Sequence, residues 1–566
     1  MRLFEVDPDA EQALDSLSLR VQRLVEAAMN YHSLVQPSRT LTYKFYMGEK
    51  WQLPCLTDTS TLNGSATTAR NLKPIFSWKA TSTVKPKTLF SPHVFTSNGQ
   101  IADRNIRHIL LTPDDATESD VENHRPESVA QRTYNFLERK FPALFDAIRE
   151  PQRAAREKKW NEPIEPYVPL QPDELFERGL VHHPVQETKP ALEPKHNAPK
   201  AVLIGMHWLQ AGGAERWAIE TITLTKRAGM TPIVLTDIPS HQPLIASQEL
   251  DNALILCLTP PIPKYQYNEP LLRSLFEQFD IRGVLVHHCQ WLYDRLYWIK
   301  RYFPAVPVVD SLHIVEYRDH GGYPNQAVSR DAYIDIHHVI SPQLVSWLSD
   351  IHGVSISKIV DAPLVGLTSS AESPTFKKRV EEGKLSISFV GRITRQKRPE
   401  AFVLLASRLK RLAASSFRVI MHGSGEFDEV IDDIMKKRGL SSFIERRSSA
   451  VPVSDTYKDS DVLVITAVNE GITLTTIEAL SAGIPVISAD IGSQRTLIPE
   501  AGLVPRETSK LVRTTAELLE KLLNDETARK ELWMSEMTLL RDFSKLESAN
   551  AYFTRLLSEW SSHEQR

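Results

Sequence analysis

The chain has 566 residues, a formal net charge of −3, 42% hydrophobic residues and 24% charged residues. This length exceeds what one hydrophobic core supports, so several domains are expected, and the near-neutral charge gives no reason to expect nucleic-acid binding. Three scattered cysteines, an opening segment that turns acidic at once, and the absence of any run near the roughly 18 apolar residues of a membrane span favour a cytoplasmic protein.

The first 200 residues carry mixed signals. Leu14, Leu17, Val21, Leu24 and Val25 recur at helical spacing. The stretch 36–113 is rich in Thr, Ser, Pro and aromatic residues, which indicates irregular or short β structure, and 127–150 is again helical in pattern. We therefore predict an N-terminal extension over 1–160 of mixed or mainly helical structure. Eight prolines in 161–200 indicate a linker or extended arm. No chemistry is assigned to this part.

Beyond Lys200, short apolar runs alternate with amphipathic helices in two series. Strands this apolar are normally covered on both faces, which predicts parallel sheets flanked by helices. The fold class expected is therefore α/β, with two facing Rossmann-like doubly wound domains over 201–370 and 371–545. A C-terminal helix over 546–566 could pack back on the first of them. Ligands of such folds bind at the carboxyl ends of the strands, so the cleft between the domains is the expected site.

Two loops of the second series carry candidate anion-binding residues. The stretch "FVGRITRQKRPE" places Gly391 at a tight turn, with Arg392 and Lys397 following it. Two cations at this edge of a parallel sheet suit a diphosphate, and a solvated basic loop is an equally good explanation of this segment alone. Gly423 and Gly425 in "HGSGE" would allow close backbone approach, although a single Gly-x-Gly is a weak signal.

The stretch "NEGITLTTIEALSAG" places two carboxylates around a helix start. Glu470 lies in the loop and Glu478 in the helix, while threonines occupy the first turn, where free N–H groups attract anions. Carboxylates accept hydrogen bonds from sugar hydroxyls, so a ligand with hydroxyls on both sides of a diphosphate, a nucleotide sugar, fits the pattern. The alternative is an acidic helix start with one buried salt bridge.

Four motifs, in this order and spacing, resemble retaining glycosyltransferases of the GT-B fold, family 4 (glycosyl transferases group 1). They are "LQAGGAERWAIETI", "GRITRQK", "HGSGE" and "YKDSDVLVITAVNEGITLTTIEALSAGIPVISADIGSQRTLI". The resemblance covers about Ala201 to Phe553. It departs from the family at Thr473, where a second glycine is usual, and at 364–367, where an Asn-Gly turn is usual.

The resemblance implies roles for individual residues. Arg392 and Lys397 would bind the donor diphosphate and stabilise the departing charge, Glu470 would hold the donor sugar, and Glu478 would hold the ribose. His313 would lie near the reacting sugar, with a satisfied structural histidine as the alternative. Backbone approach to the donor would come from these residues: Gly212, Gly213, Gly391, Gly423, Gly425, Gly471, Ile472, Thr473 and Leu474.

The activity implied is transfer of a hexose from a nucleotide diphosphate-sugar, such as a UDP- or GDP-sugar, to an acceptor hydroxyl with retained configuration. No metal and no further cofactor is expected, because Arg392 and Lys397 would neutralise the phosphates. The acceptor would be a glycan, a lipid-linked group or another hydroxyl compound in polysaccharide, glycolipid or glycoconjugate synthesis, at the inner face of the membrane or in the cytoplasm. The alternatives are a nucleotide-sugar epimerase, a phosphorylase, or a non-catalytic nucleotide-sugar-binding module.

Three other signals favour plainer explanations. The triplet Asp459–Asp461 resembles a metal-binding motif, but it directly precedes a strand and is expected to end a helix. The histidine pairs at 287–288 and 337–338 lack the partners of a zinc site, since adjacent residues on a strand face opposite ways. The basic stretch "RLKRLAASSFR" could touch a membrane, although a solvated helix face explains it better.

Overall fold

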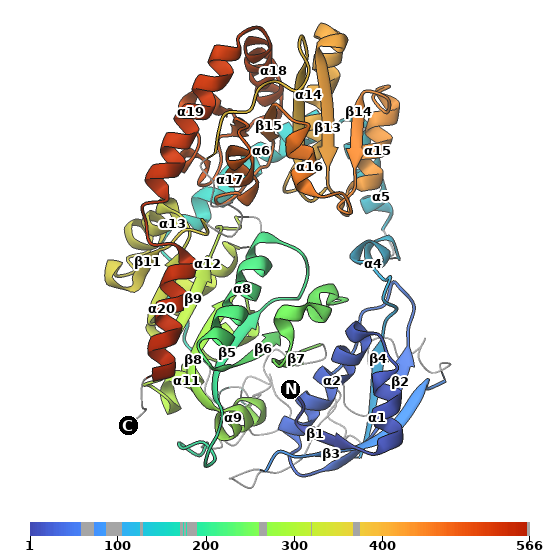
Figure 1. Cartoon of the computed structure of the whole chain (residues 1–566), viewed down its shortest axis with the longest axis vertical. Helices are drawn as coiled ribbons and strands as arrows, with labels where there is room; N and C mark the ends of the chain where they lie inside the picture. The colour runs from blue at the N-terminus through green and yellow to red at the C-terminus, as the bar shows by residue number, and fades with distance from the viewer. Residues whose placement is uncertain are drawn as a thin grey trace.

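Three β-sheets organise the chain in the computed structural model (Figure 1). The structure describes residues 1–57, 73–85, 105–124, 128–169, 174, 177, 190–259, 269–317, 320–365 and 374–562. Residues 170–173, 175–176 and 178–189 of the predicted linker and the junction at 366–373 lie outside these ranges. In the part that is described, no helix is both long and apolar enough to cross a bilayer.

The first sheet has four strands in the order β1-β3-β2-β4 and belongs to the N-terminal extension. Its strands are β1 (Phe4–Val6), β2 (Thr40–Met47), β3 (Phe76–Ser82) and β4 (Ile106–Leu111), and its helices are α1 (Pro8–Asp15), α2 (Leu19–Val35) and α4 (Glu118–His124). Ser18 caps α2 by accepting a hydrogen bond from the Val21 amide. Helix α2 is buried on nearly every side, because it packs between this sheet and the edge of the second sheet.

The second sheet has seven parallel strands in the order β11-β10-β9-β8-β5-β6-β7. Its strands are β5 (Lys200–Met206), β6 (Thr231–Thr236), β7 (Leu254–Cys257), β8 (Asp280–His287), β9 (Val308–Leu312), β10 (Ile336–Val339) and β11 (Ile359–Asp361). The helices around it are α8 (Gly213–Arg227), α9 (Glu269–Gln278), α10 (Gln290–Tyr293), α11 (Leu296–Tyr302), α12 (Gly322–Ser329) and α13 (Pro342–Ser346).

The third sheet has six parallel strands in the order β14-β13-β12-β15-β16-β17. Its strands are β12 (Leu385–Val390), β13 (Phe417–His422), β14 (Ile444–Arg447), β15 (Val462–Ile465), β16 (Val486–Ala489) and β17 (Leu503–Val504). The helices of this half are α14 (Pro399–Ala413), α15 (Asp428–Lys437), α16 (Val453–Lys458), α17 (Leu474–Ser481), α18 (Thr508–Asn524) and α19 (Glu526–Phe543). Two facing parallel sheets flanked by helices confirm the predicted α/β fold class.

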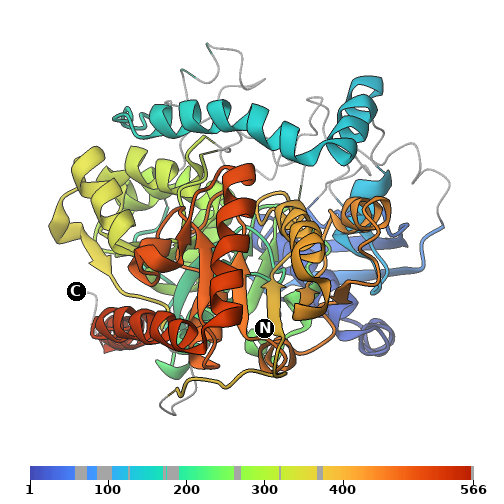
Figure 2. The ribbon, with the colours of Figure 1, turned by 90° about the horizontal axis from the view of Figure 1, so that it is seen from above.

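Two helical segments cross from one half of the molecule to the other. Helix α20 (Ala549–Ser562) follows the third sheet in the chain but packs on α8 and β8 of the second, where the Trp560 ring fills the space above Gly283. The helices α5 (Val129–Lys140) and α6 (Pro142–Trp160) belong to the extension, yet they lie across the outside of both halves on the side opposite α20 (Figure 2).

The buried apolar residues divide differently from the predicted boundaries. One continuous hydrophobic cluster joins the four-stranded sheet, α2, the seven-stranded sheet and α20, and a second one fills the six-stranded half. The buried Arg20 of α2 links the four-stranded sheet to the seven-stranded sheet, because its guanidinium donates to the backbone carbonyls of Thr112 (3.0 Å) and His241 (2.6 Å). The four-stranded sheet and the seven-stranded sheet therefore share one core.

Candidate functional site in the cleft between the two parallel sheets

The loop after β12 contains two of the predicted cations and is packed backbone to backbone on the loop after β13. Gly391 has φ +156° and Gly423 has φ +137°. A Cβ atom on Gly423 would lie 1.9 Å from the Gly391 carbonyl oxygen, and one on Gly425 would lie 2.5 Å from that of Ile393. Gly423 and Gly425 are therefore required by contact between protein loops, whether or not a ligand also approaches them.

Arg398 fixes the end of this loop. Its guanidinium is fully buried and donates to the Thr466 carbonyl (2.7 Å), the Arg506 carbonyl (2.7 Å) and the carboxylate of Asp146 in α6 (3.0 Å). Arg398 adopts the left-handed conformation at φ +53°, which costs free energy for a residue other than glycine and persists only where contacts enforce it. The Thr466 hydroxyl also donates to the Lys397 carbonyl (3.0 Å).

Lys397 and Glu470 meet in the cleft. The Lys397 Nζ atom lies 2.7 Å from Glu470 Oε1, and the Glu470 side chain is only 9% exposed. The loops that carry them are joined by a hydrogen bond from the Val468 amide to the Gln396 carbonyl (3.0 Å). The structure therefore brings together one cation and one carboxylate that the sequence predicted for a single site. Arg392, in the same loop, has an exposed side chain.

Glu478 lies in the second half of α17 and has one partner on each side of the cleft. Its carboxylate accepts a hydrogen bond from the Tyr457 hydroxyl (3.0 Å) and lies 3.7 Å from the Arg216 guanidinium of α8. Burial raises the pKa of Glu478, and the Tyr457 hydroxyl and Arg216 oppose that shift. Because Arg216 belongs to the second sheet's half, this carboxylate links the two halves of the cleft.

The glycine pair after β5 forms the start of α8. Gly212 is its N-cap, and a Cβ atom on Gly213 would meet only the Leu474 side chain of α17, at 3.7 Å. Leu474 packs on the apolar cluster of the second sheet, so α17 reaches across the cleft. Glu215, in the first turn of α8, is held by His207 (3.0 Å) and by the Trp208 indole N–H (2.6 Å). Burial would raise the pKa of Glu215, but hydrogen bonds and charge from His207 bring it to about 2.

The two halves touch at Gly471 and His313. A Cβ atom on Gly471 would lie 2.2 Å from the His313 carbonyl oxygen, so only glycine permits this approach. The His313 ring lies within hydrogen-bond distance of the Ser311 hydroxyl (3.1 Å). Burial, with neighbouring histidines such as His288, holds the pKa of His313 well below its usual range, so the ring is neutral at physiological pH. Hydrogen bonds from Asn469 to the Val315 carbonyl (2.7 Å) and between Ser493 and Ser341 (2.8 Å) reinforce the contact.

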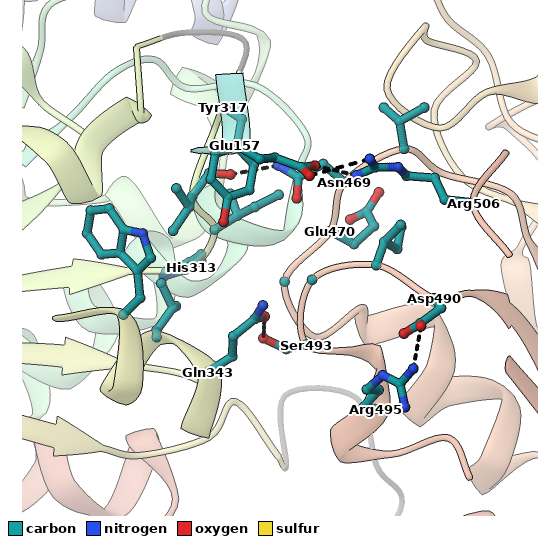
Figure 3. Close-up of a pocket in the computed structure, with 18 residues that line it drawn as sticks. Glu157, His313, Tyr317, Gln343, Asn469, Glu470, Asp490, Ser493, Arg495 and Arg506 are labelled. Carbon is teal, nitrogen blue, oxygen red and sulfur yellow. Dashed lines mark hydrogen bonds and ion pairs between the residues drawn. The ribbon is translucent and has the colours of Figure 1, made fainter. Parts of the chain in front are cut away.

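A cavity of about 310 Å³ opens beside this contact (Figure 3). Its wall includes three of the predicted site residues, His313, Glu470 and Gly471. The remainder comes from three parts of the chain: Glu157 of α6, residues after β9 and β10 (Ile314, Val315, Tyr317, Gln343, Leu344 and Trp347), and residues of the third sheet's loops (Val468, Asn469, Asp490, Ile491, Gly492, Ser493, Arg495 and Arg506). Its charged groups are paired, since Arg506 binds Glu150 and Glu157, and Arg495 binds Asp490 and Glu500.

The remaining predicted residues have structural partners. Thr473 is the N-cap of α17, and its hydroxyl pairs with that of Thr476 (2.6 Å) instead of capping the helix. Ile472 packs on the core of the third sheet. Besides the unpredicted lining of the cavity, the residues that contact the predicted groups and were missed from the sequence include Asp146, Arg216, Tyr457 and Asn469. Arg216 lies one turn into the helix after Gly213 and Asn469 directly precedes Glu470, so their position was a usable signal, whereas nothing local pointed to Asp146.

The other motifs have the structural roles that were preferred for them. Asp459 ends α16, and Asp461 accepts hydrogen bonds from the backbone amides of Val380 (2.9 Å) and Ser386 (2.8 Å). His337 lies between Asp310 (2.9 Å) and Asp331 (3.0 Å). Within the described ranges, no three His, Cys, Asp or Glu side chains gather as metal ligands would.

Comparisons with known proteins agree with the architecture of the third sheet. Residues 372–533 match the family model of glycosyl transferases group 1. A D-inositol 3-phosphate glycosyltransferase of Kineococcus radiotolerans is 25% identical over 289 residues, which are 43% of this chain and 64% of the relative. One from Rhodococcus erythropolis is 25% identical over 37% of this chain and 52% of the relative. This chain thus spans about half to two thirds of the length of these two relatives.

Among solved structures, Anabaena HepE in complex with UDP is similar over 64% of this chain and 98% of its own, with a TM-score of 0.48 and 12% identity. The matched residues 372–533 contain Lys397, Glu470 and Glu478, the groups that the structure gathers in the cleft. The third sheet and its loops are therefore similar to the glycosyl transferases group 1, and the loops that carry Lys397 and Glu470 face the second sheet across this site.

Proposed function

We propose that this protein transfers a sugar from a nucleoside diphosphate to an acceptor hydroxyl with retention of configuration. The observation that carries the proposal is the approach of Lys397 to Glu470 within 2.7 Å in a cleft between two parallel sheets. An ammonium group has three donors, so Lys397 can orient Glu470 and still bind a phosphate oxygen. The match of residues 372–533 to glycosyl transferases group 1 supports the same reaction class.

In the proposed reaction, the bond between the anomeric carbon and the β-phosphate oxygen breaks, and its electron pair goes to the phosphate. Arg392 and Lys397 stabilise this developing charge, since fixed cations in a cleft need no reorganisation. The acceptor oxygen attacks the anomeric carbon from the side that the phosphate leaves, and its proton passes to the leaving phosphate oxygen. Glu470 holds sugar hydroxyls, Glu478 holds the ribose, and neutral His313 lies beside the sugar.

The acceptor would occupy the cavity beside His313 and Glu470, with the Tyr317 and Trp347 rings in its wall. Its volume of about 310 Å³ is at the lower end of small-molecule sites, which are roughly 300–1,000 Å³. Because both arginines are paired with carboxylates, the cavity has no surplus positive charge for a phosphate. An uncharged acceptor with several hydroxyl groups therefore fits better than a phosphorylated one.

Replacement of Lys397 by alanine tests the proposal. We expect UDP- or GDP-sugars to raise the melting temperature of the wild-type protein, since a ligand at 100 times its Kd stabilises by about 2.7 kcal/mol. Lys397→Ala should lose this shift and lower turnover by about 10²-fold. Lys410→Ala is the matched control, because that lysine is exposed on α14 and donates only to the Gly439 carbonyl. Equal turnover in both variants would refute the assignment.

Assays with and without acceptor separate the alternatives. Sugar release or epimerisation without any acceptor would indicate a hydrolase or an epimerase instead. Nucleotide-sugar binding without product, across a panel of neutral and phosphorylated acceptors, would indicate a binding module. Faster turnover with the phosphorylated member of a matched acceptor pair would contradict the inference about the cavity.

A further inference from the structure

The hairpin of helices α5 and α6 has an unusual division of charge between its two faces. Residues 128–161 contain eight Arg or Lys and four carboxylates, which are Glu138, Asp146, Glu150 and Glu157. All four carboxylates bind arginines, and three of those arginines, Arg395, Arg398 and Arg506, belong to the six-stranded half. The carboxylates of the hairpin thus lie on its inner face, which packs on the six-stranded half, and their ion pairs attach the hairpin to that half.

The outer face of the hairpin combines apolar and basic side chains. Phe136 is 60% exposed, Leu144 is 56% exposed and Ile148 is 57% exposed, and Val129 and Phe141 are exposed as well. The exposed charged residues among the described side chains of 128–161 are all basic: Arg132, Lys140, Arg156, Lys158 and Lys159. Single exposed apolar residues are ordinary, but a cluster of large ones on one pair of helices marks an interaction surface.

The position of the hairpin leaves this face accessible. Helix α6 lies along the outside of the molecule, across both parallel sheets, in the view from above (Figure 2). The contacts of the inner face hold it there, including the bond between Arg395 and Glu138 at 2.7 Å and the fully buried pair of Arg398 and Asp146. The outer face is therefore presented on a rigid support.

We propose that this outer face of α5 and α6 binds the surface of a membrane that contains anionic lipids. A helix pair that lies in the interface needs apolar side chains to enter the acyl boundary and cations to meet the lipid phosphates, and this face has both. Along the chain from residue 128, the first exposed carboxylates among the described residues are Glu162 and Glu165, beyond the end of α6, and the neighbouring helix α15 carries exposed Glu429 and Asp432. A protein partner of mixed charge would not require so complete a separation of the two signs. The inference does not depend on the proposed reaction.

Vesicle flotation with the full-length protein tests the inference. We expect the protein to bind vesicles of phosphatidylcholine with 30% phosphatidylglycerol, and to bind pure phosphatidylcholine at least tenfold more weakly. Binding should weaken as salt rises from 50 to 500 mM, because surface charges are screened. The variant Phe136→Ser/Leu144→Gln/Ile148→Gln should reduce the partition coefficient at least tenfold, and so should Lys158→Glu/Lys159→Glu.

A matched control lies on α14, within the basic stretch 408–418 that was the other membrane candidate. Leu412 is 51% exposed on α14, beside the exposed Lys410 and Arg411. Leu412→Gln therefore removes an exposed leucine from a basic helix that is not part of the α5–α6 face. This variant should bind vesicles as the wild-type protein does. Unchanged melting temperatures of all variants would show that the fold is kept, since every altered side chain points outward.

Three outcomes would overturn the inference. The first is no binding to anionic vesicles by the wild-type protein. The second is equal binding by the triple variant, and the third is a loss of binding in Leu412→Gln alone. If the wild-type protein self-associates in ultracentrifugation and the triple variant does not, without vesicle binding in either, a second copy of this chain occupies the face instead.

Discussion

Gly471 sets how closely the two halves approach each other. A Cβ atom there would lie 2.2 Å from the His313 carbonyl, so Gly471→Ala must push the loop of Glu470 away from the second sheet. Because a displacement near 1 Å can cost about 10²-fold in rate, we expect kcat/KM to fall at least tenfold. The measurement is steady-state kinetics with a nucleotide sugar as donor.

Gly213→Ala provides the control for this substitution. It adds the same methyl group in the same cleft, but its nearest neighbour would be Leu474 Cδ1 at 3.7 Å, which is an ordinary contact. Because the resemblance also places Gly213 beside the donor, the comparison uses kcat at saturating donor, which should stay within about threefold of the wild-type value. A similar loss in both variants would mean that the cleft tolerates no added volume, and that the contact with His313 has no special role.

Glu400 predicts a pH dependence of stability. Burial raises the pKa of its carboxyl to about 7, while Arg398 opposes this shift and Asp146 and Glu138 add to it. The folded state therefore binds a proton that the unfolded state has released above about pH 4.5. The stability that this group contributes is complete below pH 4.5 and is lost as pH rises through 7.

Glu400→Gln removes this titration. At pH 8 the variant should be more stable than the wild-type protein by up to about 3 kcal/mol, because the glutamine side chain is neutral and folding does not have to bury a charged carboxylate. At pH 5 the difference should shrink toward zero. Urea unfolding at both pH values measures it, and a difference that is equal at pH 5 and pH 8 would contradict the assigned pKa.

The structure brings together residues whose signal was local. Lys397 and Glu470 were expected in one site because each follows an apolar strand, and the carboxyl ends of parallel strands meet at one edge. Asp146 could not be found this way. Its partner Arg398 is 252 positions away, and only the folded chain shows that the two are buried together.

At the scale of elements, helix α6 attaches the N-terminal extension to the loop of Lys397. Burial would raise the pKa of Asp146, but the guanidinium groups of Arg398 and Arg153 hold it below its usual range, so the carboxylate is charged. Asp146→Asn should destabilise the protein by about 3–5 kcal/mol, the usual cost of breaking a buried pair. It should also weaken binding of a nucleoside diphosphate about tenfold, with UDP or GDP as the probe, since Arg398 loses one of the groups that hold the loop in place.

Glu150→Gln is the matched variant on the same helix. Glu150 binds Arg506 and Arg153 at 25% side-chain exposure, and it has no hydrogen bond with residues 391–398. Its effect on UDP binding, measured by calorimetry at a temperature where both variants are folded, should be under twofold. If Asp146→Asn and Glu150→Gln weaken nucleotide binding equally, the pair of Asp146 and Arg398 has no special role in positioning the loop of Lys397.

The elements themselves were easier to predict than their partners. Ten strands of the two parallel sheets were identified from short apolar runs, because burial on both faces leaves a continuous apolar pattern. The short edge strands β11, β14 and β17 were not predicted. The stretch 36–113 was assigned only to irregular or short β structure, and β2, β3 and β4 lie within it. Their pairing could not be predicted, since β2 pairs antiparallel with β3 and parallel with β4 across long intervening segments.

At the scale of the whole molecule, the extension is part of the first core. A shortened chain that begins at Lys200 would leave β7 and α9 without the apolar side chains of α2, such as Leu24, Val25 and Ala28. We expect this chain to be insoluble, or to melt well below the full-length protein and bind a hydrophobic dye. Soluble yield and thermal unfolding measure this. A cooperative transition at the wild-type temperature would show that the seven-stranded half is complete alone.

The buried pair of Asp146 and Arg398 also has a consequence for how the protein is made. At roughly 5–20 residues per second, the ribosome releases Asp146 about 13–50 s before Arg398, which is 252 positions later. The four-stranded and seven-stranded sheets can form in that interval, but α6 has no surface to dock on until the last third of the chain arrives. Until then, the charged and apolar side chains of nascent α6 stay in water. The six-stranded half, which is synthesised last, then binds a helix that was synthesised well before it.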